Sequence, residues 1–195
     1  GHIDEIGLII SYIDPEGFIY FQTIGGWDPQ MLVGQRVRIW TKDGQIITGC
    51  IGRKPIHQLS EEAQKQVVRI EDLWIDVGSK EHSGLVSIGD CAVIDYSPLF
   101  LAQNKFAARG IDDRIGAFVV LEALRLIEKE KLTEAVYAVA TVQEEIGLRG
   151  AITSTYGINP QIGIAVDVTF AADFPGADKK GGDIKLGKGP VITIG

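Results

Sequence analysis

The chain changes its pattern of apolar residues once, close to residue 100. Before that point, short strand-like runs follow one another with turns between them, which is typical of a small barrel or sandwich. Residues 14–17, Asp-Pro-Glu-Gly, form one such turn, because Gly, Pro and Asp supply the backbone angles that tight turns need. A polar run from Ser60 to Val68 predicts one helix with Ser60 as its N-cap. The strand-like runs are IGLIISYI, GFIYFQTI, QRVRIW, QIITGCIG, RIEDLWIDV and DCAVIDY.

After about residue 105 the sequence alternates helical and strand-like segments. Apolar residues recur at helical spacing from Asp113 to Lys129, and the continuous apolar run from Ala135 to Val142 predicts a strand buried on both faces. A second helix is predicted from Leu148 to Tyr156, and a second strand from Ile162 to Val166. This alternation favours an α/β fold with a mainly parallel sheet covered by helices.

The two patterns predict two domains. Residues 1–8 and 95–195 form the α/β domain, and residues 9–94 form a small β-barrel inserted near its start. The only methionine is Met31, and the final strand-like run stops at Gly195. We therefore expect the chain to be truncated at both ends.

Composition excludes some classes of partner. The chain has 26 acidic and 19 basic residues, a formal net charge of -7 and no basic stripe, so we expect no nucleic-acid partner. No apolar run approaches the ~20 residues that span a bilayer, which predicts a soluble protein without membrane contact. Cys50 and Cys91 lie in strand-like runs and are expected to be buried free thiols of a cytoplasmic protein.

Four acidic stretches lie where apolar runs give way to loops. Ligands collect beyond the carboxyl ends of the strands of an α/β sheet. Imidazole nitrogens and carboxylate oxygens that converge there suit zinc, manganese or cobalt. The set holds more carboxylates than one metal needs, so the sequence predicts a two-metal hydrolase. The stretches are centred on His2–Asp4, Asp112–Asp113, Glu144–Glu145 and Asp167.

Local geometry suggests how the residues near the first two stretches divide their roles. Residues i and i+2 of a strand share a side, so Asp4 can orient the ring of His2 and leave its other nitrogen for metal. Asp113 is explained as a helix N-cap, which leaves Asp112 free to bridge metals. Taken alone, His2 and Asp4 would be better explained as a surface pair, and His2 could also be an expression-tag remnant. Two helix caps would explain Asp112 and Asp113 about as well as metal binding does.

The other two stretches follow predicted strands. Glu144 and Glu145 point to opposite sides of a strand, so one can bind metal while the other faces substrate as general base. Two glutamates can also mark only the point where a strand reaches solvent. Asp167 directly follows a strand and is a better ligand than Asp173, which lies in the next loop and orders that loop or meets substrate.

In combination, these motifs resemble a known family. H-x-D-E-I-G, D-D-R-x-G, Q-E-E-x-G-L-R-G-A and A-x-D-V-T-x-A-x-D-x-P-G occur here in the order found in the glutamyl/tetrahedral aminopeptidases. Those are di-metal exopeptidases, although some relatives carry endoglucanase names. Residues 52–57 and 72–78 resemble the inserted barrel of that family, which mediates dimerisation, and the dimers assemble into tetrahedral dodecamers.

The resemblance implies an activity and a role for each site residue. The protein would remove N-terminal residues from short peptides with a free N-terminus, using two divalent ions, zinc or cobalt. Glu144 would be the general base that acts on a metal-activated water, and Asp4 would orient His2. The implied metal ligands are His2 on one ion, Asp112 as the bridge, Glu145, and Asp167 on the ion opposite Glu145.

One departure from the family pattern keeps alternatives open. The family's last ligand is a histidine well downstream of Asp167, and the chain ends before that position. His57 and His82 lie in the inserted domain and do not match it. A truncated, non-catalytic relative that keeps the fold and the assembly role is therefore the main alternative. Glycoside hydrolysis by two carboxylates would leave His2 unexplained.

Overall fold

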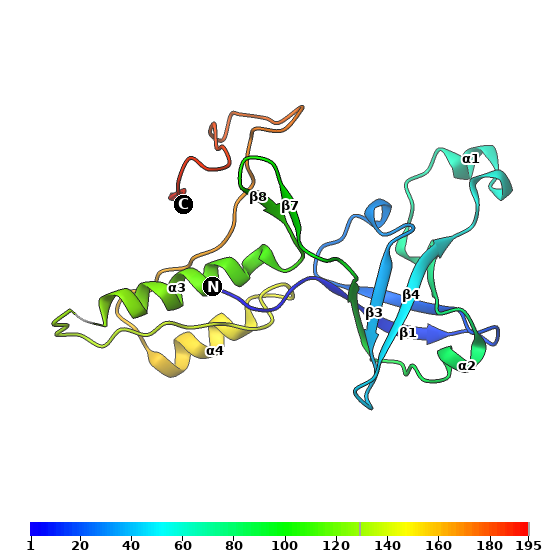
Figure 1. The fold of residues 1–195 in the computed structure, drawn as a ribbon, viewed down its shortest axis with the longest axis horizontal. Helices are drawn as coiled ribbons and strands as arrows, with labels where there is room; N and C mark the ends of the chain where they lie inside the picture. The colour runs from blue at the N-terminus through cyan, green and yellow to red at the C-terminus, as the bar shows by residue number, and fades with distance from the viewer. Residues whose placement is uncertain (129, 195) are drawn as a thin grey trace.

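The computed structural model describes residues 1–128 and 130–194, and its largest ordered unit is a closed antiparallel β-barrel (Figure 1). All six strand-like runs before residue 100 contribute a strand to it. In their order around the barrel, the strands are β1 (Gly7–Ile13), β2 (Ile19–Ile24), β5 (Leu73–Asp76), β4 (Ile46–Arg53), β3 (Arg36–Trp40) and β6 (Cys91–Ile94).

The barrel encloses the main hydrophobic core because alternate residues of each strand point inward. Leu8 and Ile10 of β1, and Val37 and Ile39 of β3, are almost wholly buried. Leu32, from the loop before β3, is also fully buried. The same alternation places the two cysteines outside: both are free, as predicted, but both are exposed, which corrects the expectation that they are buried.

Short helical turns connect the barrel strands. Ser60 caps α1 as predicted, with its Oγ accepting a hydrogen bond from the backbone N–H of Ala63 at 3.2 Å. The helix is shorter than the predicted one, and the first part of RIEDLWIDV forms a 3-10 turn rather than strand. These turns are η1 (Pro29–Met31), η2 (Ile56–Gln58), α1 (Glu61–Gln64), η3 (Ile70–Asp72) and α2 (Lys80–Ser83).

Two longer helices follow the barrel and lie to one side of it, with the N-terminus beside α3 (Figure 1). Helix α3 (Ile111–Ile127) and helix α4 (Arg149–Ile158) match the two predicted helices, although the predicted end of the first, Lys129, lies outside the described residues. A hairpin that the sequence did not predict precedes them, formed by β7 (Leu99–Leu101) and β8 (Lys105–Ala107). None of the described helices is both long and apolar enough to cross a membrane.

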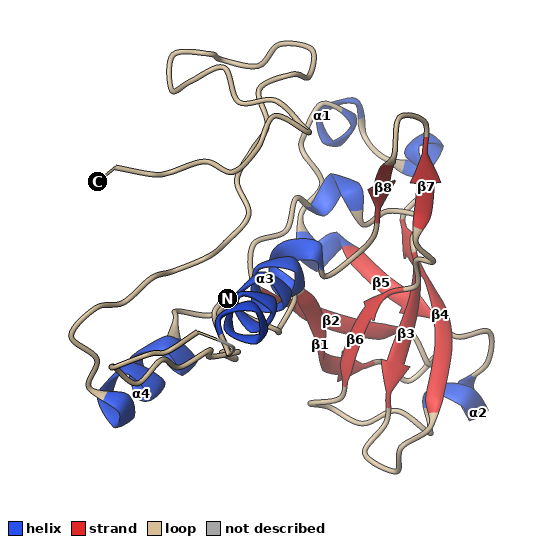
Figure 2. Ribbon diagram, turned by 60° about the vertical axis from the view of Figure 1, so that its left-hand side comes forward, coloured by secondary structure: helices blue, strands red, loops and turns tan. Residues whose placement is uncertain are grey.

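The predicted strands at 135–142 and 162–166 are not formed. Among the described residues, strands occur only in the barrel and the hairpin (Figure 2), and residues 135–142 make one isolated parallel bridge, between Thr141 and His2. A β-strand exists only where a neighbouring strand accepts and donates its backbone hydrogen bonds. Within the described residues these segments find no such neighbour, so the apolar pattern is present without the sheet.

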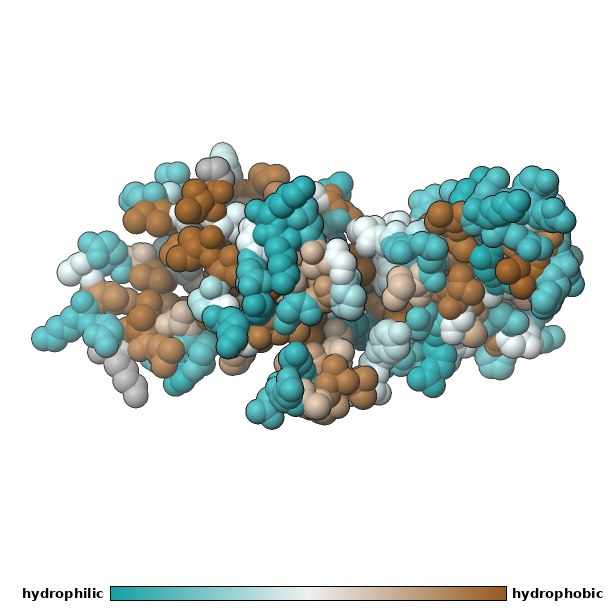
Figure 3. All heavy atoms as spheres, turned by 90° about the horizontal axis from the view of Figure 1, so that it is seen from above, coloured by the Kyte–Doolittle hydropathy of each residue, from teal (hydrophilic) through white to brown (hydrophobic). Residues whose placement is uncertain are grey.

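The helical half consequently exposes much apolar surface. Figure 3 shows apolar side chains at the surface of the half that carries α3 and α4. Phe118 of α3 and Tyr156 of α4 are 59% and 89% exposed, and Ile164 is 83% exposed. Side chains of this kind ordinarily lie in a core or an interface.

Candidate metal centre

The first residues of the chain lie among the helices rather than in the barrel. The backbone N–H of Ile3 donates to the carbonyl of Thr141 at 2.9 Å, and the N–H of Thr141 donates to the carbonyl of Gly1 at 3.0 Å. The N–H of His2 donates to Asp113 Oδ2 at 3.1 Å. These bonds leave His2 only 2% exposed, beside segments more than 100 residues away in the sequence.

The ring of His2 faces carboxylates on both sides. Its Nδ1 lies 3.2 Å from the carbonyl oxygen of Asp4 and 3.4 Å from Asp4 Oδ1. Its Nε2 lies 3.1 Å from Asp112 Oδ1 and 3.6 Å from Glu144 Oε2. Contact with Asp4 therefore occupies one nitrogen and leaves the other directed at the carboxylates, which is the arrangement expected from the H-x-D motif.

Asp4 also holds the loop that carries the two glutamates. Its Oδ1 accepts a hydrogen bond from the backbone N–H of Glu144, and its Oδ2 accepts one from the N–H of Glu145, each at 3.2 Å. One carboxylate thus bridges the histidine and the Q-E-E loop. The sequence predicted the contact with His2 but not these two hydrogen bonds, because they join residues about 140 positions apart.

The Asp112–Asp113 pair precedes the regular part of α3. Both residues have non-helical backbone angles, and the peptide bond between them is cis. Asp113 is fully buried, and its Oδ1 accepts a hydrogen bond from the N–H of Gly116 at 2.9 Å, which is the predicted N-cap contact. The Asp112 side chain is 60% exposed and reaches His2 from the solvent side.

Among the residues that the structure describes, two sets of side chains bring possible metal-binding atoms within 4.8 Å of one another. The first set, His2, Asp112 and Glu145, consists of residues predicted as ligands. The second set joins His2 and Asp167 with Asp113, to which the sequence had assigned only a capping role. The sequence did not predict Asp113 as a metal ligand, because a role as helix N-cap already explained its position. Its approach to His2 in the structure makes it a further candidate ligand.

Asp173 does not belong to either set. Its Oδ2 accepts a hydrogen bond from the backbone N–H of Leu186 at 3.4 Å, so it orders the loop in which it lies. This was one of the two roles that the sequence left open for it.

The crowded charges shift the pKa values of two groups. Burial lowers the pKa of His2, but Glu144, Asp4, Asp167 and Asp112 together raise it above its ordinary value of 6.5. Burial, and then the neighbouring charge of Asp112, raise the pKa of Glu145. Carboxylates that gather around one imidazole offer the oxygen and nitrogen donors that zinc, cobalt and manganese accept, so this donor set fits divalent metal ions.

The barrel closes one side of the centre through the loop after β2. A Cβ added to Gly25 would lie 3.3 Å from Glu145 Oε2 and 2.6 Å from Ile6 Cγ2. The backbone of Gly25 also has φ +76°, which side chains disfavour. Only glycine therefore allows this loop to approach Glu145 so closely.

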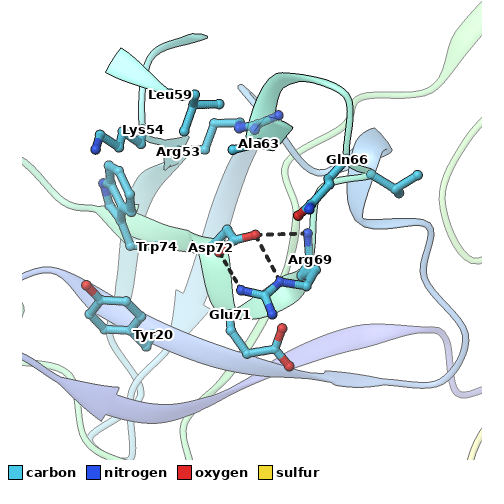
Figure 4. A pocket seen from close by; sticks show the side chains of 11 residues that line it. Tyr20, Arg53, Lys54, Leu59, Ala63, Gln66, Arg69, Glu71, Asp72 and Trp74 are labelled. Carbon is cyan, nitrogen blue, oxygen red and sulfur yellow. Dashed lines mark hydrogen bonds and ion pairs between the residues drawn. The ribbon is translucent and has the colours of Figure 1, made fainter. Parts of the chain in front are cut away.

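A hollow of about 330 Å³, separate from the cluster around His2, lies on the outside of the barrel (Figure 4). Tyr20 and Trp74 form part of its wall, and segment 53–72 covers it. Asp72 is bound there by Arg69, with Oδ1 3.2 Å from Nη2, and this contact holds the pKa of Asp72 below its usual value. None of the predicted site residues lines this hollow, so the candidate chemistry belongs to the cluster around His2.

Comparison with known proteins places the whole chain in one class, the aminopeptidases. Residues 1–195 match the M42 glutamyl aminopeptidases, and the chain belongs to that family. It is 37% identical to the lysyl aminopeptidase of Pyrococcus furiosus over 201 residues, covering 100% of this chain and 56% of the relative. The chain spans about half the length of the curated relatives that it matches.

Two solved structures share the fold. A TET aminopeptidase from a marine sediment archaeon of the Thaumarchaeota superimposes with a TM-score of 0.89 and 39% identity, over 97% of this chain and 55% of that one. The Pyrococcus horikoshii TET1 peptidase, described as able to assemble into a tetrahedron or a large octahedral shell, gives a TM-score of 0.81 and 40% identity, over 97% and 56%. The barrel and its attachment to the helices therefore recur in known aminopeptidases.

The raised pKa of His2 predicts a pH dependence for the metal-free protein. A folded pKa above the unfolded one means that the protonated ring stabilises the fold. That contribution is fully present below pH 6.5 and is lost as pH rises through the folded pKa. An NMR titration of the imidazole, assigned with His2→Gln, should give a pKa above 6.5 without metal and no titration with a saturating divalent ion. A metal-free value at or below 6.5 would contradict this reading of the charges.

Proposed function

We propose that the complete protein is a metal-dependent aminopeptidase that hydrolyses the N-terminal residues of short peptides. One observation carries the proposal: the buried ring of His2 turns Nε2 toward Asp112 Oδ1 at 3.1 Å, in a set that also includes Glu145. Family membership supports the same activity. The proposal concerns the complete protein, because the relatives are about twice as long as this chain.

The residues divide between holding metal and moving protons. We assign His2, Asp112, Glu145 and Asp167 as the residues that would hold two divalent ions, and zinc and cobalt match this donor set best. Such ions supply Lewis-acid polarisation of the scissile carbonyl. In the same proposal, the last ligand is a histidine outside these 195 residues.

Glu144 is assigned as the general base. Its carboxylate faces the centre, with Oε2 3.6 Å from His2 Nε2, while its backbone N–H is fixed by Asp4. From this position it would take a proton from the attacking water and return it to the departing amine. Asp4 supports the assignment in two ways, since it orients His2 through Nδ1 and anchors the loop that carries Glu144.

The exposed apolar segments fit a further part of the proposal. We assign 135–142 and 162–166 as strands of a helix-covered, mainly parallel sheet in the complete protein, with the barrel at 9–94 as an insertion. The exposure of Val136, Tyr137, Ile162 and Ile164 supports this assignment, because a sheet buried on both faces would cover them.

Peptide hydrolysis with and without a chelator tests the activity. The complete protein should release N-terminal residues from a library of short peptides, lose activity with a chelator and regain it with zinc or cobalt. N-acetylated peptides should resist. Peptide hydrolysis that survives chelation would contradict the metal dependence, and metal binding without turnover would favour the non-catalytic assembly role.

Changing each of the two glutamates to glutamine should separate their roles. Glu144→Gln should keep the metals and lower turnover by about 10²–10⁴-fold, the contribution typical of positioned proton transfer. Glu145→Gln should instead weaken metal binding. Metal content and the rate at saturating substrate measure the two effects, and equal metal loss from both variants would refute this division of roles.

We also propose that the protein self-associates through the barrel, forming dimers that build a dodecamer. Met31, Trp40 and Ile46 are 63%, 39% and 49% exposed, and the last two are cross-strand neighbours. Leu32, which follows Met31 in the sequence, is buried in the core and does not belong to this surface. The P. horikoshii relative assembles into closed shells, which supports the proposal. Light scattering should show dimers or larger species at micromolar concentration, and a purely monomeric sample would contradict it.

A cytoplasmic location belongs to the same proposal. The two cysteines are free and exposed, and thiols in this state persist in reducing compartments. Cell fractionation reads the location directly.

A further inference from the structure

Glu5 binds two arginines beside the metal centre, and neither the family motifs nor the proposed chemistry gives this contact a use. Its Oε1 lies 3.1 Å from Arg109 Nη1 and 2.9 Å from Arg114 Nη2. The Glu5 side chain is only 13% exposed, so solvent screens these pairs less than it screens pairs at an open surface. The partners lie 104 and 109 residues from Glu5 in the sequence.

Glu5 and its neighbour Asp4 contact the loops on the two sides of the centre. Glu5 follows Asp4 directly, and neighbouring residues of an extended segment point to opposite sides. Asp4 therefore binds the loop of Glu144 and Glu145, while Glu5 binds the loop that carries Asp112. Together they fix the N-terminal segment between the two loops.

Arg114 completes the connection. Its Nε donates to the carbonyl oxygen of Ile3 at 3.1 Å, so one guanidinium binds both the backbone beside His2 and the carboxylate of Glu5. A Cβ on Gly110 would lie 2.7 Å from Arg114 Nη1 and 3.3 Å from Glu5 Oε2. The guanidinium thus packs directly on the backbone two residues before Asp112, where φ is +66° and glycine is favoured.

We propose that Glu5 is a positioning residue for the metal centre, an inference that rests on the proposed function. By holding Arg109 and Arg114, it fixes the loop of Asp112 against the segment of His2 and so sets the approach of Asp112 Oδ1 to His2 Nε2. It also keeps both guanidinium groups engaged. Without the charge of Glu5, either guanidinium would be free to pair with the exposed carboxylate of Asp112, where it would occupy an oxygen that the metal needs.

Charge-removing and charge-keeping variants of Glu5 test the inference in the complete protein. Glu5→Gln removes the charge at nearly constant size, and Glu5→Asp keeps the charge on a shorter side chain. Glu122→Gln is the matched control, because Glu122 binds Arg125 on the exposed side of α3, with Oε2 2.8 Å from Nε. The readouts are Co²⁺ affinity, the Co²⁺ absorption spectrum and the thermal unfolding midpoint.

Glu5→Gln should weaken Co²⁺ binding by about 10–100-fold, the usual effect of losing a group that orients metal ligands, and should alter the absorption spectrum. Glu5→Asp should recover part of the affinity, and Glu122→Gln should match the unchanged protein. A lower unfolding midpoint for Glu5→Gln with unchanged affinity and spectrum would overturn the inference and leave the proposed function standing.

The unchanged protein separates the two proposals further. If it binds Co²⁺ but hydrolyses no peptide, the proposed activity fails, and the affinities of the variants still decide the role of Glu5. If it binds no Co²⁺, the metal centre and the positioning role are both overturned.

Discussion

The candidate site depends on the placement of the first five residues. They form no regular strand, yet the backbone pairs with Thr141, and the N–H of His2 is bound by the buried carboxylate of Asp113. The chain then leaves for the barrel and returns more than 100 residues later at the start of α3. Because the barrel is closed by its own hydrogen bonds, it can be inserted at this point without separating the segments that meet at His2.

The meeting of these segments brings like charges close together, and this has a chemical consequence. Burial, and then the neighbouring negative charge of Asp112, disfavour ionisation of Glu145 and raise its pKa, while for His2 the surrounding carboxylates outweigh burial and raise the pKa of the imidazole. A divalent cation bound there would favour the ionised form of Glu145 and take the place of the proton on His2. Arg109 and Arg114 bind Glu5, and their positive charge partly offsets the negative charge of the carboxylates around His2.

The sequence predicted the barrel well and the α/β half only in part. Barrel strands pair with one another inside the chain, so their alternating pattern was sufficient to predict them. The burial predicted for Cys50 and Cys91 was wrong, because both lie on the outward-facing positions of their strands. Residues 135–142 and 162–166 have the pattern of buried strands, but a pattern cannot supply the neighbours that pairing requires. At the site, the motifs singled out residues that the structure brings together around His2. The contacts of Asp113 and Glu5 were not predicted, because they span more than 100 residues.

The proposed function requires that His2 and carboxylates from distant segments form one divalent metal centre. Anomalous X-ray diffraction from crystals of the protein grown with Co²⁺ can locate the metal. We expect an anomalous peak within coordination distance of His2 Nε2, Asp112 and Glu145. Cobalt bound only elsewhere, for example at the acidic residues beside the barrel hollow, or a centre in which His2 Nε2 contacts protein atoms alone, would refute the metal centre.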